Sequence, residues 1–77
     1  MEKFTMVENV RCHLKEIRMA RGISREELEM ISGVSLYTIA RAERNVRLPR
    51  ADTLCALAGS LGCTLDELIT FDVVEVD

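Results

Sequence analysis

The sequence predicts an all-α fold in which five short helices form one compact domain, followed by a short extended C-terminal tail. Three observations support this prediction. Apolar residues recur every three or four positions through most of the chain, which indicates amphipathic helices. Capping motifs and glycines divide these stretches into short segments. The length of 77 residues, with 48% hydrophobic and 30% charged residues, is typical of a single folded domain.

The first helix is expected to begin at Thr5-Met6-Val7-Glu8, a capping box in which the Thr5 hydroxyl and the Glu8 carboxylate bind backbone N–H groups. An apolar stripe at helical spacing then follows, formed by Val7, Val10, Leu14 and Ile17. Gly22 ends this helix, because glycine adopts the left-handed conformation of a helix C-terminus without strain.

A second capping box, Ser24-Arg25-Glu26-Glu27, opens a short helix that stops at Gly33. Ser35 caps the third helix, over residues 36–44. This helix ends at Asn45, because asparagine tolerates the left-handed conformation best after glycine.

The second and third helices, joined by Gly33-Val34-Ser35, form a helix-turn-helix. At about 1.5 Å per residue, the third helix is a rod of roughly 13 Å. The major groove of DNA is about 12 Å wide and admits such a rod, so the side chains at its front would meet base edges.

Pro49 prevents the connection after the third helix from being helical. The fourth helix follows, with an apolar face of Leu54, Leu57, Ala58 and Leu61, and Gly62 closes it. A third capping box, Thr64-Leu65-Asp66-Glu67, opens a short fifth helix that turns Leu68 and Ile69 inward.

The tail, residues 71–77, is rich in β-branched residues and has no helical period. One short strand is not stable alone, and four of its residues are large and apolar: Phe71, Val73, Val74 and Val76. Two alternatives follow. The tail is a dimerisation strand that pairs with its symmetry mate, or Phe71 packs on its own domain and the remaining residues fray.

Charge is distributed unevenly along the chain, although the net charge is only −3. Residues 11–50 carry nine basic residues, eight of them Arg, against five acidic residues, whereas residues 51–77 carry six acidic residues and no basic one. A basic centre with an acidic end suits a polyanionic partner, and Arg suits bidentate recognition of phosphate or guanine. The alternative is ordinary charge on helix surfaces.

Catalytic and metal-binding patterns are weak in this sequence. The single His13 leaves no histidine triad or cluster, and Cys12, Cys55 and Cys63 lack the paired spacing of a zinc site. Cys55 and Cys63 are expected in the core. We therefore expect no enzyme, cofactor, metal or small-molecule ligand. The sequence has no signal peptide and no apolar run long enough to cross a bilayer, so we expect a cytoplasmic protein without a membrane partner.

The spacing of many elements over about residues 8–69 resembles the XRE family, the Cro and phage-repressor type of helix-turn-helix. The resemblance rests on the stretch Leu14-Lys15-Glu16-Ile17-Arg18-Met19-Ala20-Arg21-Gly22-Ile23-Ser24-Arg25-Glu26-Glu27-Leu28, then on Gly33-Val34-Ser35, Thr38-Ile39, Arg41, Glu43-Arg44-Asn45, Pro49, Thr53-Leu54 and Leu61-Gly62-Cys63-Thr64-Leu65-Asp66-Glu67-Leu68. It implies that residues 1–70 are a five-helix domain of a transcriptional regulator that binds double-stranded DNA, commonly as a homodimer.

The resemblance also implies site residues. Base contacts would come from the third helix, about residues 35–44, through Ser35, Leu36, Tyr37 and Arg41. Phosphate contacts would come from Arg25, Thr38, Arg44, Asn45 and Arg47. For Leu36 and Tyr37 the alternative is that both are ordinary surface residues.

Arg18 and Glu43 correspond to residues that commonly form a structural ion pair in this family. The pair would orient the third helix and prevent the Glu43 carboxylate from repelling phosphates. The alternative is two unrelated surface charges.

The sequence departs from the family pattern in the second helix. Glu29 replaces a small residue, so its carboxylate must point outward or find a cation such as Arg41. Met30 and Ile31 are apolar where the family is polar, and Ser32 is polar where it is apolar. Either the helix is rotated so that Ile31 replaces Ser32 inward, or Met30 and Ile31 form an exposed patch for a protein partner. The second option favours an alternative function, an antitoxin-like or anti-regulator interaction module on the same fold.

Overall fold

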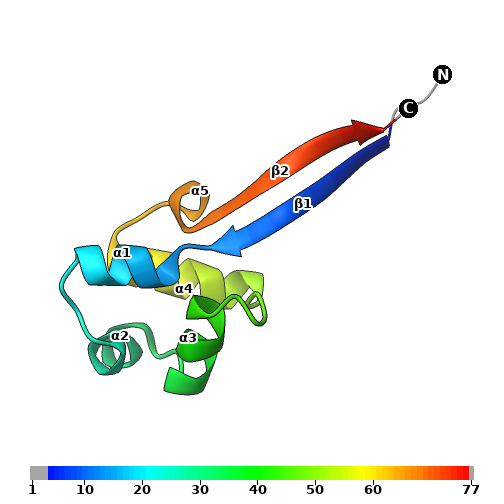
Figure 1. Cartoon of the computed structure of the whole chain (residues 1–77). Coiled ribbons are helices and arrows are strands. Elements are labelled where there is room, and N and C mark those ends of the chain that lie inside the picture. Colours follow the sequence, from blue (N-terminus) through cyan, green and yellow to red (C-terminus); the bar gives the residue numbers. More distant parts are fainter. Residues whose placement is uncertain (1–3, 77) are drawn as a thin grey trace.

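The computed structural model describes residues 4–76, which form five helices and two strands. Strand β1 precedes the helices and strand β2 follows them (Figure 1). In chain order the elements are β1 (Phe4–Cys12), α1 (Leu14–Ala20), α2 (Arg25–Ser32), α3 (Leu36–Glu43), α4 (Ala51–Leu61), α5 (Leu65–Leu68) and β2 (Ile69–Val76).

The prediction of an all-α fold is wrong, because β1 and β2 pair as an antiparallel two-stranded sheet. The pairing runs from Phe4 opposite Val76 to Cys12 opposite Ile69. The expected capping box of Thr5 to Glu8 lies inside β1. Five helices are present as predicted, but the first begins at Leu14.

A β-bulge explains why β1 resembles a helix in sequence. The register shifts between Glu8 and Arg11, and Asn9 has a positive φ of 55° there. The extra residue changes the two-residue alternation of a strand into the three-residue spacing of Val7 and Val10. The side-chain amide of Asn9 donates a hydrogen bond to Asp72 Oδ2 across the strands at 2.8 Å.

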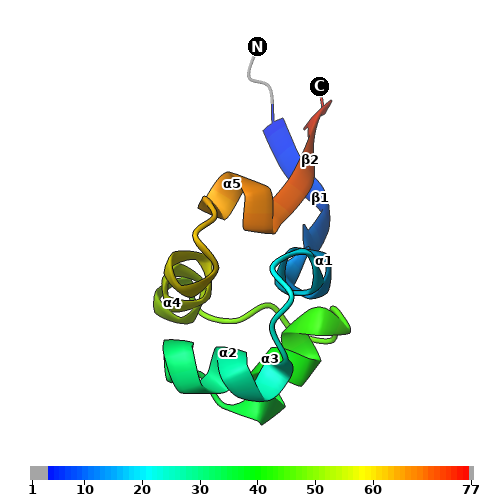
Figure 2. The same cartoon turned by 90° about the vertical axis from the view of Figure 1, so that its left-hand side faces the viewer.

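The tail does not fray over its described residues, because it pairs with β1 of its own chain; a role of this strand in dimerisation stays a prediction. Strand β2 begins at Ile69 and extends to Val76, and residue 77 lies outside the described residues. Together β1 and β2 form a ribbon that extends away from the helices, so the molecule measures 51 × 20 × 19 Å (Figure 1). In both views α2 and α3 lie at the end of the helical part farthest from the tip of the ribbon (Figures 1 and 2).

The helices enclose a small aliphatic core, as the low aromatic content requires. Its buried members are Cys12, Leu14, Leu28, Ile39, Ala42, Leu54, Leu57, Ala58, Leu61 and Leu68. The prediction that Cys55 lies in the core is wrong, because this residue is on the exposed side of α4. Cys63 packs partly buried against the core, and burial raises the pKa of the Cys12 and Cys63 thiols.

The N-terminal caps predicted for α2, α3 and α5 are confirmed by their hydrogen bonds. The boxes at Ser24 and Thr64 both form, with each hydroxyl and each partner Glu carboxylate accepting a backbone N–H. Gly33 and Gly62 end α2 and α4 in the left-handed conformation. Asn45 follows α3 with a φ of 55°. Across the part of the chain that the structure describes, no helix has the length and apolarity needed to cross a membrane.

Candidate nucleic-acid interface

The turn between α2 and α3 is defined by local hydrogen bonds. Gly33 adopts a φ of 74°, which a residue with a side chain would reach only with strain. Ser35 Oγ accepts the Thr38 N–H at 3.2 Å and so caps α3. The two helices pack through the buried side chains of Leu28 and Ile39. The result is a helix-turn-helix in which one side of α3 faces solvent.

Glu29 provides a second cap for α3 from the neighbouring helix. Its Oε2 accepts a hydrogen bond from the Leu36 N–H at 2.9 Å. The first N–H groups of a helix lack partners within the helix, and a carboxylate there also interacts favourably with the helix dipole. Glu29 therefore has neither of the two expected placements, because its partner is a backbone N–H rather than solvent or Arg41.

Helix α2 keeps the orientation in which Ser32, not Ile31, faces inward. Ser32 Oγ donates to the Leu28 carbonyl at 2.6 Å and accepts the Val34 N–H at 3.1 Å, so the polar side chain is satisfied where it lies. Met30 is 82% exposed and Ile31 is 60% exposed. The two residues form an exposed apolar pair on the outer side of α2.

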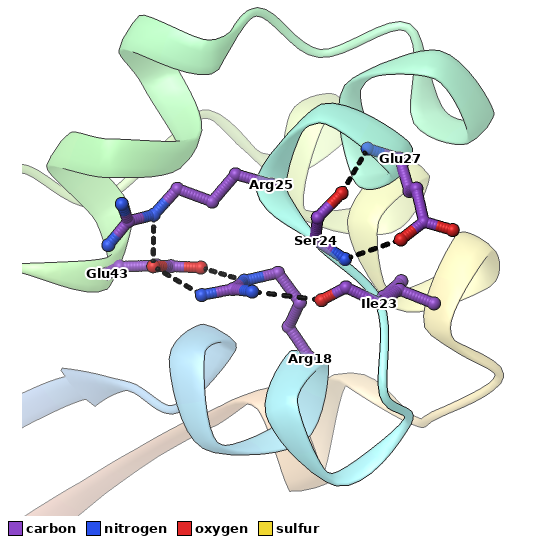
Figure 3. Close-up of polar contacts among 6 residues, drawn as sticks. All are labelled: Arg18, Ile23, Ser24, Arg25, Glu27 and Glu43. Carbon is purple, nitrogen blue, oxygen red and sulfur yellow. Dashed lines mark hydrogen bonds and ion pairs between the residues drawn. The ribbon is translucent and has the colours of Figure 1, made fainter.

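Arg18, Arg25 and Glu43 form an ion-pair network that joins three helices (Figure 3). Arg18 Nε donates to Glu43 Oε2 at 2.6 Å, and Arg25 Nε donates to Glu43 Oε1 at 2.9 Å. The Glu43 side chain is only 1% exposed, whereas that of Arg25 is 44% exposed. Arg18 also donates to the Ile23 carbonyl at 2.9 Å, which fixes the connection between α1 and α2.

The pKa values of the network follow from these contacts. Burial raises the pKa of the Glu43 carboxyl, but the hydrogen bonds from Arg18 and Arg25 outweigh it and hold that pKa below its ordinary value. The hydrogen bond to Glu43 raises the pKa of Arg18. Glu43 is therefore ionised and compensated, so its negative charge at the end of α3 does not oppose an anionic ligand.

The exposed side of α3 borders a surface concavity of about 280 Å³. The concavity lies between α3 and the loop that leads into α4, and its lining residues are Tyr37, Thr38, Arg41, Arg47, Leu48, Pro49, Arg50 and Thr53. Three of these are arginines and none is acidic. The Arg41 guanidinium lies over the Tyr37 ring, 5.2 Å from its centroid, which is cation–π distance.

The structure brings together some of the predicted site residues and engages others elsewhere. Tyr37, Thr38, Arg41 and Arg47 line the concavity; Arg44 does not line it and is exposed at the C-terminal cap of α3. Ser35 is exposed at the start of α3, where its hydroxyl also donates to Thr38 Oγ1 at 3.1 Å. Leu36 is partly buried there, with its N–H bound to Glu29.

Asn45 forms two hydrogen bonds with the end of β1. Its Oδ1 accepts the Cys12 N–H at 2.7 Å, and its Nδ2 donates to the Cys12 carbonyl at 3.3 Å. The amide thus connects the turn that follows α3 to the base of the ribbon. Both polar ends of this side chain are occupied by protein.

Sequence reasoning missed Arg50 and Thr53, which line the concavity from the start of α4. The signal for Arg50 was present, because it belongs to the same arginine-rich segment as Arg41 and Arg47. Thr53 was part of the family spacing, but nothing in the sequence assigned it a role at the site. Within residues 4–76, no group of three or more His, Cys, Asp or Glu side chains is placed to hold a metal ion.

Comparison with known proteins agrees with this geometry. A family model described as Helix-turn-helix matches residues 14–68, which is most of the chain. A solved structure of the P22 c2 repressor protein, in complex with synthetic operator 9T in the presence of Tl+, is 30% identical with a TM-score of 0.64. That match covers 69% of this chain and 80% of the repressor chain. No curated protein sequence matches. The chain belongs to the helix-turn-helix family of the XRE, or Cro and phage-repressor, type.

Proposed function

We propose that this protein is a sequence-specific DNA-binding transcriptional regulator that inserts α3 into the major groove. The observation that carries the proposal is the solvent-facing side of α3, where Tyr37 and Arg41 project beside an arginine-lined concavity. The only acidic residue of α3, Glu43, is neutralised by two arginines. The family and the operator-bound repressor support the same reading.

Base readout is assigned chiefly to Arg41. A guanidinium can donate two hydrogen bonds to the N7 and O6 acceptors of one guanine, the most common specific contact in the major groove. Stacking on the Tyr37 ring restricts the rotamers of Arg41 before DNA binds, which reduces the entropy cost of the contact. Leu36 offers an apolar contact to a thymine methyl group, and Ser35 offers a hydroxyl at the front of the helix.

Phosphate contacts are assigned to Arg44 and Arg47, with Arg50 added from the concavity and Thr38 as a neutral donor. Arg25 is partly exposed and would have to share its guanidinium between Glu43 and a phosphate. For Asn45 we propose a positioning role instead of a phosphate contact, because its amide is bound to the Cys12 backbone.

The regulator is further proposed to act as a homodimer. One α3 helix reads only a few base pairs, and two half-sites one helical turn apart multiply the contacts that a small domain can make. A two-fold protein would favour a palindromic operator, with half-site centres about 34–36 Å apart.

The experiment begins with selection of bound duplexes from a random pool, followed by fluorescence anisotropy titrations at two salt concentrations. The proposal expects an enriched palindromic sequence and an affinity that falls steeply as salt rises, because phosphate contacts release counterions. It also expects random duplex to bind more weakly, by a factor of about 10³ or more. Absence of binding to any duplex at low salt would refute the proposal.

One observation favours a second candidate function, an antitoxin-like or anti-regulator protein-interaction module. Met30 and Ile31 lie exposed and adjacent on α2, outside the proposed DNA contacts. An apolar patch of this kind is typical of protein contact sites. The anisotropy titration separates the two functions, because the interaction module needs no affinity for DNA.

A further inference from the structure

The ribbon formed by β1 and β2 exposes an unusual amount of apolar side chain. Eight of its large apolar residues are solvent-exposed: Phe4, Met6, Val7, Val10, Phe71, Val73, Val74 and Val76. We propose that the ribbon is a docking surface for the same ribbon of a second copy of this chain. This inference names the contact of the proposed dimer, and its relevance to DNA rests on that proposed function.

The ribbon is not expected to be stable as an isolated structure. A lone two-stranded pair is only marginally stable in water, because neither face is covered by other elements. Here the strands are connected only through the helices, so pairing is maintained from the base alone (Figure 1). At that base Cys12 is bound by Asn45, and the His13 N–H donates to the Leu68 carbonyl at 2.8 Å. Toward the tip, the apolar side chains of the two strands are not covered by the helices, so a stable ribbon needs another surface to cover them.

The strand register identifies the face that would be covered. Residues opposite each other in an antiparallel pair lie on the same face, and the faces alternate along each strand. Near the tip one face therefore carries only large apolar residues, the pairs Phe4–Val76 and Met6–Val74. The opposite face at this level carries Val7 and Val73, but also the polar pair Thr5–Glu75. We call the first set, Phe4, Met6, Val74 and Val76, the tip cluster.

The amount of exposed surface matches what a dimer would bury. The chain exposes 5412 Å², whereas a compact monomer of 8.7 kDa exposes about 4,700 Å². The excess is of the same order as the roughly 800 Å² that each partner of a standard interface buries. A second ribbon laid across the tip cluster would cover apolar side chains and leave the Glu8–Asp72 pair at the rim, in water.

Charge argues against DNA as the occupant of the ribbon, and position leaves room for a second copy. The described part of the ribbon carries Glu8, Asp72 and Glu75 against Arg11, a net charge of −2, which repels phosphates. The helical part lies at the other end of the molecule, so two ribbons can meet at their tips without covering α3 (Figures 1 and 2). A symmetric contact of identical apolar clusters is the usual form of a two-fold interface.

The test compares two neighbouring valines of β2 in the full chain without DNA. Val74→Lys places a charge in the tip cluster, and Val73→Lys places the same charge on the opposite face of the same strand. Both variants make the same substitution at neighbouring positions of one strand, so the main difference between them is the face that carries the lysine. Met6→Lys and Thr5→Lys repeat the comparison on β1. Circular dichroism spectra show which variants keep the helical fold.

Sedimentation equilibrium gives the dimer dissociation constant of each variant at micromolar concentrations. The inference expects a wild-type dimer. Val74→Lys and Met6→Lys should raise its dissociation constant about tenfold or more, and their controls should change it less than about threefold. A monomeric wild type, equal effects at both faces, or dissociation by Met30→Lys on α2 alone would overturn it. A dimer that binds no duplex would leave this inference intact and refute the proposed function.

Discussion

Two hydrogen bonds join the side-chain amide of Asn45 to the backbone of Cys12: Asn45 Oδ1 accepts from the Cys12 N–H, and Asn45 Nδ2 donates to the Cys12 carbonyl. Asn45 lies two residues after the end of α3, and Cys12 is the last residue of β1. The helix that is proposed to read DNA and the ribbon that is proposed to mediate dimerisation therefore share one fixed connection. Their relative orientation would set the spacing of two half-sites.

Replacing Asn45 by Gly should lower the free energy of unfolding by about 1–2 kcal/mol. Glycine keeps the positive φ without strain, so the loss reports the two hydrogen bonds and the unpaired backbone groups of buried Cys12. Asn45→Asp retains an acceptor for the Cys12 N–H and should lose less than Asn45→Gly. Urea unfolding measures both variants, and a glycine variant as stable as wild type would show that the connection contributes nothing.

Glu29→Ala should destabilise the domain by about 0.5–1 kcal/mol, because the Leu36 N–H at the start of α3 loses its acceptor. The better helix propensity of alanine offsets part of this loss. Glu26→Ala is the matched control, since Glu26 is an exposed glutamate of the same helix. Thermal melts decide the prediction. Equal melting temperatures for the two variants would mean that the cap has no energetic role.

Arg18→Ala should cost about 2–4 kcal/mol, because it leaves the buried Glu43 carboxylate with Arg25 as its only charged partner. Arg21→Ala should cost about 1 kcal/mol, since Arg21 Nε donates a single hydrogen bond to the Leu61 carbonyl. Arg47→Ala, at the exposed loop, should be close to neutral. Equal melting temperatures for Arg18→Ala and Arg47→Ala would show that Arg18 contributes no more to stability than a surface charge does.

Acid should destabilise the protein through Glu43. Its folded pKa lies below the ordinary value of 4.5, so the unfolded chain binds a proton at a higher pH than the folded chain does. The associated stability is complete above about pH 4.5 and is lost as the pH falls toward the folded pKa. Glu27 and Glu67 change stability with the same sign, because backbone N–H groups of their capping boxes lower their pKa values.

The control is Glu43→Gln, which is expected to be less stable at pH 7 but to lose less stability between pH 5 and pH 3. Urea unfolding at several pH values compares the two slopes. Identical slopes in wild type and variant would show that Glu43 is not the titrating group.

Features determined by neighbouring residues were predictable from the sequence. The capping boxes at Ser24 and Thr64 and the left-handed residues at Gly33 and Asn45 follow from hydrogen bonds and backbone preferences within a few positions. The same reasoning failed at Thr5. Residues that can form a capping box permit a helix start but do not require one. Strand β1 forms there because β2, more than 60 residues away, supplies its hydrogen-bond partners.

The site shows the same division between local and tertiary determinants. The arginines around α3 were visible in the sequence, and so was the positive-φ position at Asn45. The partners of Glu29 and of the Asn45 amide depend on how α2, α3 and β1 meet, which no spacing encodes. Cys55 was misplaced because an apolar residue of α4 can lie one position away from the buried face.

The central claim is that α3 reads base pairs while the following loop binds phosphates, and comparison of Arg41→Ala with Arg47→Ala tests it most directly. Anisotropy titrations of both variants use the selected operator and random duplex over a series of salt concentrations. Arg41→Ala should lose about 1–3 kcal/mol of discrimination between the two duplexes, and Arg47→Ala should weaken both equally while reducing the salt slope by about one. Specific and non-specific binding left unchanged by both substitutions would contradict the account.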